Sequence, residues 1–308
     1  MDAPRSVILG ANGFLGPALA ARLMAAGFAV TTVTRHDRPV LEGAAHARWD
    51  GKSQGDWARQ LDGAAVVINL AGKSIDCRHT PENLAVIRSS RVDSTAAVAE
   101  AVAACGRPPA TWLNASTAAI YRPRVEEQPH ATEDDPPEAG EELREVGIAW
   151  EDALFAPELP ETRRIAMRIS VVLGEGGALP VLRRLTRWGL GGAAGSGRQW
   201  MSWITVEDLC AAVLHLIDHE EVTGPVNFAA PGALTNRDFM AAMRRVMKRP
   251  IGLPAPAFGI RLGARLVGTE AKLVLESMKV APKRLLESGF AFADPELEPA
   301  LEKLLRVS

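Results

Sequence analysis

Apolar residues form short continuous runs in the first half of the chain, and amphipathic stretches separate these runs. The main runs are residues 6–9, 29–34, 64–72, 111–119 and 162–174, with a shorter one at 46–50. Such runs are typical of parallel strands covered on both faces. The intervening stretches at 14–26, 81–106 and 141–155 have helical spacing. The pattern predicts an α/β fold: a doubly wound parallel sheet of the Rossmann type, with helices on both faces.

Three glycines lie between the first strand and the first helix, in GANGFLG at residues 10–16. Gly10 permits a tight turn, Gly13 lets the backbone approach a pyrophosphate, and Gly16 lets helix and strand pack closely. The helix N-terminus offers unpaired N–H groups to the anion. Glycine triplets also occur in plain connectors, but here a strand precedes the triplet and a helix follows it. The turn therefore predicts a dinucleotide site.

The residue that reads the ribose is expected at the end of the second strand, after Thr34. Many NAD binders carry an acidic residue there, whereas this chain carries Arg35. A guanidinium can pair with a 2′-phosphate and stack on adenine, which favours NADP(H) over NAD(H). Asp37 keeps NAD open, and Arg35 can also be a solvated loop cation.

Ligands of doubly wound sheets lie over the carboxyl ends of the strands. Asp50, after the third strand, can accept a hydrogen bond from the adenine amino group or only cap its own turn. We expect the cofactor to contact the glycine turn and the strand ends, at Gly10, Asn12, Gly13, Phe14, Leu15, Gly16, Thr34, Arg35, Asp50, Leu70, Ala71, Gly72, Lys73, Arg78, Ala115 and Val171.

The regular alternation loosens after residue 174. Segment 174–205 is rich in glycine and tryptophan, and a further strand is expected in GPVNFAAP at 224–231. We expect residues 1–174 to form the NADP-binding domain and residues 175–308 to form a smaller C-terminal α/β lobe. That lobe binds the substrate and extends the sheet. The candidates for substrate contact, which can equally be loop polar groups or a packing tryptophan, are Arg198, Gln199, Ser202 and Trp203.

Composition narrows the class of partner. Lys and Arg number 35 against 37 Asp and Glu, for a net charge of −2, so nothing indicates a nucleic acid or an anionic membrane surface. No apolar run approaches the roughly 18 residues of a membrane span, and no leader pattern precedes the first strand. Three distant cysteines and isolated histidines predict no metal site. We expect a cytoplasmic protein with a small-molecule substrate, and a solvated acidic loop at 133–135.

Several motifs resemble those of the extended short-chain dehydrogenase/reductase superfamily, also called NAD-dependent epimerase/dehydratase proteins. GANGFLG resembles its cofactor turn, NLAG its fourth-strand motif and STAAIY its fifth-strand motif. Across nearly the whole chain, blocks such as IRSSRVDST, GSGRQWMSWI and GFAF resemble an atypical subgroup described as sugar-nucleotide epimerase-like or cell-division-inhibitor-like. The resemblance implies NADP(H), and a monomer or a homodimer paired through the 81–105 and 141–155 helices. The subgroup commonly has glutamate where this chain has Lys73.

The superfamily's usual catalytic site has a Ser or Thr at the end of the fifth strand and a Tyr-x-x-x-Lys on the next helix. The lysine lowers the pKa of the tyrosine, which exchanges a proton with the substrate while hydride moves to or from the cofactor. Setting Glu151 against the family's helix glutamate places Leu143 at the tyrosine position and Gly147 at the lysine position. The standard mechanism cannot run on these two residues.

Thr117 and Tyr121 are the candidate catalytic residues. The Thr117 hydroxyl stands at the Ser/Thr position and can hold the substrate oxygen or bond its own backbone. Tyr121, the only tyrosine, lies at the end of the fifth strand, where relatives carry a tyrosine that lines the substrate site. It can be the catalyst, line the ligand or only pack. No lysine lies nearby in sequence, so we expect its pKa to stay close to about 10.

Two functions are consistent with the sequence. The first is an NADP(H)-binding, epimerase-like oxidoreductase that transfers hydride at a hydroxyl or carbonyl carbon of a sugar nucleotide or another carbonyl compound. The second is a non-catalytic binding or regulatory protein that responds to NADP(H). Leu143 and Gly147 motivate the second, because proton transfer has lost both of its usual groups.

Overall fold

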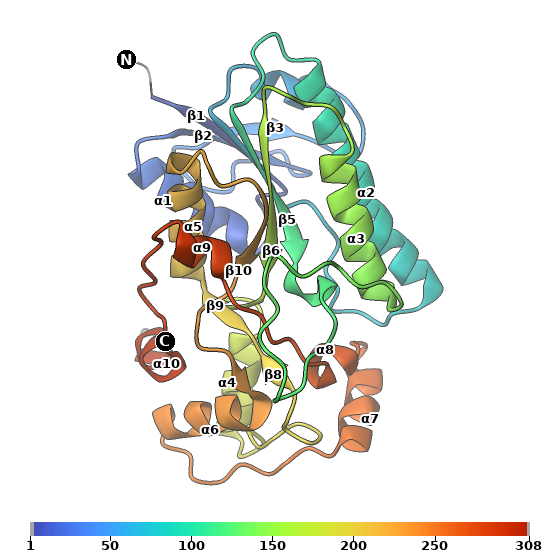
Figure 1. Cartoon of the computed structure of the whole chain (residues 1–308), viewed down its shortest axis with the longest axis vertical. Coiled ribbons are helices and arrows are strands. Elements are labelled where there is room, and N and C mark those ends of the chain that lie inside the picture. Colours follow the sequence, from blue (N-terminus) through green and yellow to red (C-terminus); the bar gives the residue numbers. More distant parts are fainter. Residues whose placement is uncertain (1–2, 307–308) are drawn as a thin grey trace.

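A computed structural model describes residues 3–306 (Figure 1). Seven parallel strands form the main sheet, in the spatial order β3-β2-β1-β4-β5-β6-β10. They are β1 (Arg5–Leu9), β2 (Ala29–Thr34), β3 (Ala45–Arg48), β4 (Val66–Asn69), β5 (Thr111–Thr117), β6 (Arg163–Ile169) and β10 (Gly224–Phe228). The chain reverses its direction of travel across the sheet between β1 and β4. The predicted doubly wound sheet is confirmed, and its ligand crevice is expected at that reversal.

Helices cover both faces of this sheet (Figure 1). On one face α1 (Leu15–Ala25) packs against α5 (Val206–Asp218), and on the other α2 (Pro81–Ala103) packs against α3 (Glu142–Phe155). Alternate side chains of β1 enter different cores: Ile8 joins the α1 and α5 cluster, while Val7 and Leu9 join the α2 and α3 cluster. A strand buried on both faces needs this two-residue alternation of apolar side chains.

Local signals fix where the helices begin and end. The Thr80 hydroxyl caps α2 by accepting a bond from the Asn83 N–H, and Pro81 fills the first helical position. The chain leaves α1 through Gly27, which has a φ of +89°. Glycine adopts this left-handed conformation without strain, so it stops the helix and returns the chain to β2.

The C-terminal lobe gathers at the lower end of the molecule in Figure 1. Its core contains Trp203, Phe239, Met243 and Leu301. Further elements after residue 174 are α4 (Leu179–Arg187), β8 (Trp200–Met201), β11 (Leu234–Thr235), α6 (Asn236–Val246), α7 (Ala257–Val267), α8 (Lys272–Leu275), α9 (Lys283–Glu287) and α10 (Leu297–Arg306). Two short 3₁₀ helices occur earlier in the chain, η1 (Asp56–Gln60) and η2 (Ala118–Ile120).

The single strand predicted over 162–174 is wrong, because the chain bends at Ser170. The backbone N–H and the hydroxyl of Ser170 both donate to the Phe228 carbonyl, at 3.1 and 2.8 Å. Beyond this point β7 (Val171–Leu173) leaves the main sheet and pairs in parallel with β9 (Trp203–Thr205). The strand predicted within 224–231 is confirmed as β10, which pairs with β6 and extends the sheet.

Candidate functional site

The glycine turn between β1 and α1 has the shape of a phosphate cradle. A Cβ on Gly10, which has a φ of +71°, would lie 2.7 Å from the Ala71 nitrogen, and one on Gly16 would lie 1.9 Å from the Ala11 carbonyl oxygen. A Cβ on Gly13 would meet only the Gly10 carbonyl oxygen, at 3.9 Å. Gly10 and Gly16 therefore serve close packing of the backbone, while Gly13 borders open space.

The first turn of α1 supplies no side chain that would neutralise the N-terminus of the helix. Phe14 stands at the N-cap without a side-chain cap bond, and the first turn contains no acidic residue. The unpaired N–H groups and the helix dipole thus face the same opening as Gly13. An anionic pyrophosphate fits this combination of open space and unfilled donors.

The ring of Phe14 packs against the glycines of segment 174–177. A Cβ on Gly176 would lie 2.3 Å from its Cδ2 atom, and Gly174 and Gly177 also lie against the ring. The glycines of segment 174–177 thus let the backbone rest on the cofactor turn.

At the end of β2, the arginine predicted to read the ribose has no protein partner. Arg35 is exposed and makes no side-chain hydrogen bond or ion pair with residues 3–306. The nearby acid, Asp37, is paired with Arg48 at 3.2 Å. Thr34 exchanges bonds with the backbone of His36 and fixes the turn. The charge left available here is therefore positive.

Asp50 caps its own turn, which was one of the two readings of the sequence. Its Oδ1 accepts from the N–H groups of Lys52 and Ser53, at 2.9 and 2.8 Å. These backbone bonds lower the pKa of Asp50 to about 2. The residue also borders a pocket of about 410 Å³ at the end of β3, lined in part by Trp49 and Trp57.

The loop after β4 is held by a buried amide pair that the sequence analysis missed. The Asn69 side chain donates to Asn114 Oδ1 at 2.8 Å and accepts from the Ala71 N–H at 3.0 Å. Lys73 and Arg78 are engaged beyond this point: Lys73 Nζ donates to Asn83 Oδ1 at 2.7 Å, and Arg78 donates to the Arg265 carbonyl at 2.6 Å.

The other residues expected near the cofactor lie at or near the carboxyl ends of the strands. They include exposed and half-buried positions, at Asn12, Leu15, Leu70, Gly72 and Val171, and the buried Ala115. Val171 falls in β7 rather than at the end of the sixth strand.

Glycine at position 147 lets α3 approach the end of β5. A Cβ on Gly147 would lie 3.0 Å from Cγ2 of Thr117 and 3.4 Å from Cγ1 of Ile120. A longer side chain there would have to displace the threonine. Leu143, one turn earlier, is half-buried. At Gly147 the helix thus presents no polar side chain to the end of β5.

Thr117 makes the local bond considered from the sequence. Its Oγ1 accepts from the Ala119 N–H at 3.1 Å, and within residues 3–306 no acceptor takes the hydroxyl proton. Because a hydroxyl is both donor and acceptor, that proton remains available to a ligand oxygen.

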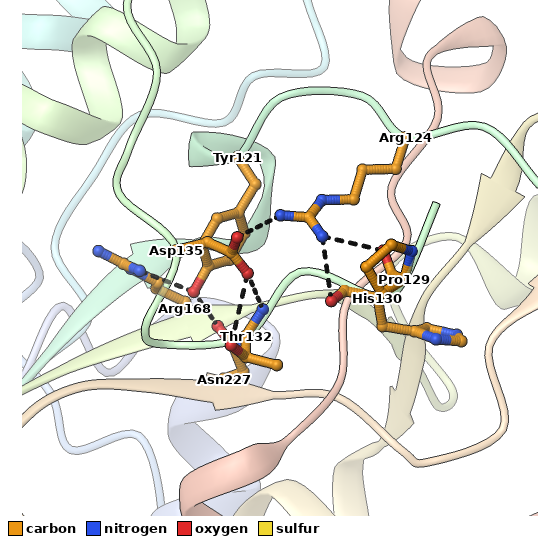
Figure 2. Close-up of polar contacts among 8 residues, drawn as sticks. All are labelled: Tyr121, Arg124, Pro129, His130, Thr132, Asp135, Arg168 and Asn227. Carbon is orange, nitrogen blue, oxygen red and sulfur yellow. Dashed lines mark hydrogen bonds and ion pairs between the residues drawn. The ribbon is translucent and has the colours of Figure 1, made fainter. Parts of the chain in front are cut away.

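Tyr121 is buried, and its hydroxyl is bonded on both sides (Figure 2). The hydroxyl donates to Asn227 Oδ1 at 2.8 Å and accepts from Arg168 Nη1 at 2.7 Å. Arg168 in turn forms a two-point ion pair with Glu151, with bonds of 2.8 and 2.7 Å. Ser116 donates to the same carboxylate at 2.7 Å. The group thus ties β5, β6, β10 and α3 together.

Burial outweighs the positive charge of Arg168 at this hydroxyl. It raises the pKa of Tyr121 to about 12, against which Arg168 and Asn227 act in the opposite direction. The expectation of an unshifted pKa is therefore wrong in this environment. At neutral pH the phenol stays protonated and its single proton is committed to Asn227, so the geometry disfavours proton transfer to a substrate.

The acidic loop at 133–135 is not the solvated surface that the sequence suggested. Glu133 is 6% exposed, and its Oε1 accepts from the Asn227 N–H at 2.8 Å. Burial raises its pKa above the ordinary value. Asp135 pairs with Arg124, which also donates to the carbonyls of Pro129 and His130 and so closes the loop (Figure 2).

Three of the four residues expected to touch substrate are bonded within the lobe. Gln199 donates to the carbonyls of Ala194 and Val274, at 2.9 and 3.1 Å. Ser202 and Trp203 have no exposed surface; Ser202 bonds the strand-like segment 278–280, and Trp203 donates to the Gly232 carbonyl at 2.8 Å. In this conformation Ser202 and Trp203 do not contact a ligand, because other side chains cover them completely. Arg198 is exposed.

Residues 3–306 contain neither a candidate metal site nor a candidate membrane-spanning helix. No group of three or more His, Cys, Asp or Glu side chains is arranged to hold a metal ion. No helix in that range is long and apolar enough to cross a bilayer.

Solved structures with the same fold include a protein bound to NADPH and a protein described as a nucleoside-diphosphate sugar epimerase. The human epimerase family protein SDR39U1, in a structure with NADPH, has a TM-score of 0.88 and 30% identity over 98% of this chain and 99% of that chain. A nucleoside-diphosphate sugar epimerase from Corynebacterium glutamicum has a TM-score of 0.78 and 28% identity, covering 98% of this chain and 58% of that one.

Sequence comparison gives the same relationship. The epimerase family protein YfhF of Bacillus subtilis is 32% identical over 297 residues, which is 96% of each chain. Residues 6–229 match the NAD dependent epimerase/dehydratase family, and residues 255–304 match a domain of unknown function, DUF1731. The resemblance noted in the cofactor turn and the strand-end motifs is thereby confirmed, and the chain belongs to the NAD-dependent epimerase/dehydratase family.

Proposed function

We propose that the chain is an NADP(H)-binding, epimerase-like oxidoreductase acting on a hydroxyl or carbonyl carbon of a small molecule. The observation that carries the proposal is the open cradle at Gly13 and the uncapped N-terminus of α1, followed by an arginine without a protein partner after β2. NADPH in the structure of the 30% identical human relative supports the phosphorylated cofactor.

The residues at this edge have separable roles. Gly10 and Gly13 let the backbone N–H groups of the turn reach a pyrophosphate, and Arg35 pairs with a 2′-phosphate. Thr117 donates its unused hydroxyl proton to the substrate oxygen and so orients the reacting carbon. When bound, the nicotinamide supplies or accepts the hydride. Tyr121 is a catalytic candidate from the sequence, but its hydroxyl joins the end of β5 to Arg168 on β6 and Asn227 on β10, which gives it a structural role.

Sugar nucleotides and simpler carbonyl compounds are the proposed substrates, because a neighbour of 28% identity is a nucleoside-diphosphate sugar epimerase. Of the residues expected to contact substrate, only Arg198 combines exposure with a free charged group, since its guanidinium makes no bond with residues 3–306. It is therefore the proposed substrate contact of the lobe.

The experiment has a binding arm and a turnover arm. Calorimetric titration with NADPH and NADH should give tighter binding of NADPH, and Arg35→Ala should remove the preference. The protein is then incubated with NADPH or NADP⁺ and a panel of carbonyl compounds and sugar nucleotides, and absorbance of the reduced cofactor is followed. The proposal would be refuted if the protein bound neither NADPH nor NADH.

A second candidate is a non-catalytic protein that responds to NADP(H). The packing of Gly147 against Thr117 and the protonated, fully bonded Tyr121 favour it, because neither helix α3 nor the end of β5 presents a general base. Tight NADPH binding without turnover on any substrate, together with a protein partner whose affinity changes with NADPH, would support this function over catalysis.

A further inference from the structure

Arg91 is a half-buried arginine beside Gly72, in the loop that follows β4, and it has no ion pair with residues 3–306. It lies on α2, and its Nη1 donates to the carbonyls of Lys73 and Ile87, at 2.9 and 3.0 Å. Its guanidinium lies 4.9 Å from the centre of the Trp150 ring. Within residues 3–306 no carboxylate pairs with it, and Nε and Nη2 make no hydrogen bond.

Two other arginines, both on β6, are held through more than one nitrogen. Arg168 has a two-point ion pair with Glu151. Arg163 has no close ion pair, but its two terminal nitrogens donate to carbonyls at and just beyond the C-terminal end of α5 and to the Thr111 hydroxyl. Arg91 differs from both, because one nitrogen carries all of its protein bonds. Burying a cation without an anion is costly, and desolvation lowers its pKa to about 10.

The location of this charge connects it with the cofactor edge. A Cβ on Gly72 would lie 3.4 Å from Cγ and Cζ of Arg91, so the absence of a side chain lets the guanidinium rest against the end of β4. Trp150, on which Arg91 stacks, lies one turn beyond Gly147 on α3. Gly147 in turn abuts Thr117 at the end of β5. Arg91 and Thr117 thus lie against positions 150 and 147 of α3, which are one turn apart on the helix.

We propose that Arg91, from α2, binds oxygen atoms in the nicotinamide half of the dinucleotide. The inference rests on the proposed function. Nε and Nη2 provide three N–H donors, and hydroxyl and phosphate oxygens are the acceptors on that half of the ligand. The stack on Trp150 and the two carbonyl bonds hold the guanidinium in place beforehand, which makes Arg91 a positioning residue for the cofactor.

The test compares two ligands that share an adenine half. NADPH carries the nicotinamide half, whereas adenosine 2′,5′-bisphosphate lacks it. Both are titrated calorimetrically against the full-length protein, the Arg91→Met variant and a control, Arg88→Met, whose arginine is exposed on the same helix without a partner within residues 3–306. Arg91→Met should weaken NADPH ~10- to 100-fold, as expected for lost charge-assisted bonds, and change the bisphosphate less than about twofold. Arg88→Met should change neither.

Stability provides an independent readout. If Arg91 were only a structural residue, Arg91→Met would lower the unfolding midpoint and weaken both ligands alike, and that outcome overturns the inference. Unchanged NADPH affinity overturns it as well. Arg91→Gln, which keeps a donor for the Lys73 carbonyl, serves the same comparison if the methionine variant does not fold. Failure of the unmodified protein to bind NADPH would instead refute the proposed function, and with it this assignment.

Discussion

Replacing Tyr121 by phenylalanine removes one hydroxyl, and each of its two buried partners loses one hydrogen bond. The ring can stay in place, while Asn227 Oδ1 loses a donor and Arg168 Nη1 loses an acceptor. A buried hydrogen bond contributes about 1 kcal/mol, and one to a charged group about 1.5–3 kcal/mol. We therefore expect Tyr121→Phe to lower the free energy of unfolding by about 2–4 kcal/mol, measured by urea denaturation.

The same variant separates a supporting role from a catalytic one. NADPH affinity should remain within about twofold, and any turnover should fall by less than the ~10²- to 10⁴-fold expected for loss of a general acid or base. A double-mutant cycle with Asn227→Ala should give a coupling of about 1 kcal/mol, because the two side chains share the bond. An unchanged unfolding free energy with abolished turnover would refute the reasoning.

Because Tyr121 is the only tyrosine, an optical pH titration reports on this one phenol. Ionisation should occur near the raised pKa of about 12, rather than at the roughly 10 of an unfolded chain. The phenol then contributes its full stability below about pH 10 and loses it as pH rises toward the folded value, since only the unfolded chain ionises in that window. Ionisation at or below about pH 10, the value of an unperturbed phenol, would contradict the burial argument.

Three further predictions concern the cofactor turn and the acidic loop. Arg35→Ala should weaken NADPH and adenosine 2′,5′-bisphosphate ~10-fold or more and leave NADH unaffected, by calorimetry; equal loss for NADH would argue against a 2′-phosphate contact. Gly13→Val should abolish dinucleotide binding without lowering the thermal midpoint, because the side chain enters open space, whereas Gly16→Ala should lower the midpoint, because its Cβ meets the Ala11 carbonyl at 1.9 Å; the reverse order would show that the two glycines are misassigned. Burial raises the pKa of Glu133, so the wild type should lose stability relative to Glu133→Gln as pH rises above about 4.3, and parallel pH profiles in urea unfolding would exclude that shift.

Local pattern was sufficient for the first βαβ unit. The spacing of Gly10, Gly13 and Gly16, the strand before them and the helix after them all lie in contiguous sequence, so the turn could be predicted locally. The contact of this turn with a dinucleotide, and that of Arg35 with a 2′-phosphate, stay predictions. The strands and helices of the sheet were predicted because a continuous apolar run and a helical period are both properties of contiguous sequence.

Contacts between distant residues were beyond such patterns. The bond between Tyr121 and Asn227 spans 106 positions, and Glu133 reaches the Asn227 backbone across 94. The acidic loop read as solvated surface because the sequence does not show which carboxylate turns inward. Ser202 and Trp203 looked available for the same reason. Arg91 could not be singled out, because the charged residues Arg88 and Asp93 lie close to it in the sequence of α2.

The last strand of the sheet reaches its place late in synthesis. β10 begins at Gly224, after α4, β8, β9 and α5 in the chain. It nevertheless pairs with the edge of β6, and its Asn227 accepts the hydrogen bond of the Tyr121 hydroxyl. A nascent chain released before this point would expose β6 as an open edge, available for pairing with other chains. Fragments that end near residue 174 are therefore expected to aggregate, and we expect the sheet to be complete only after residue 228 has left the ribosome.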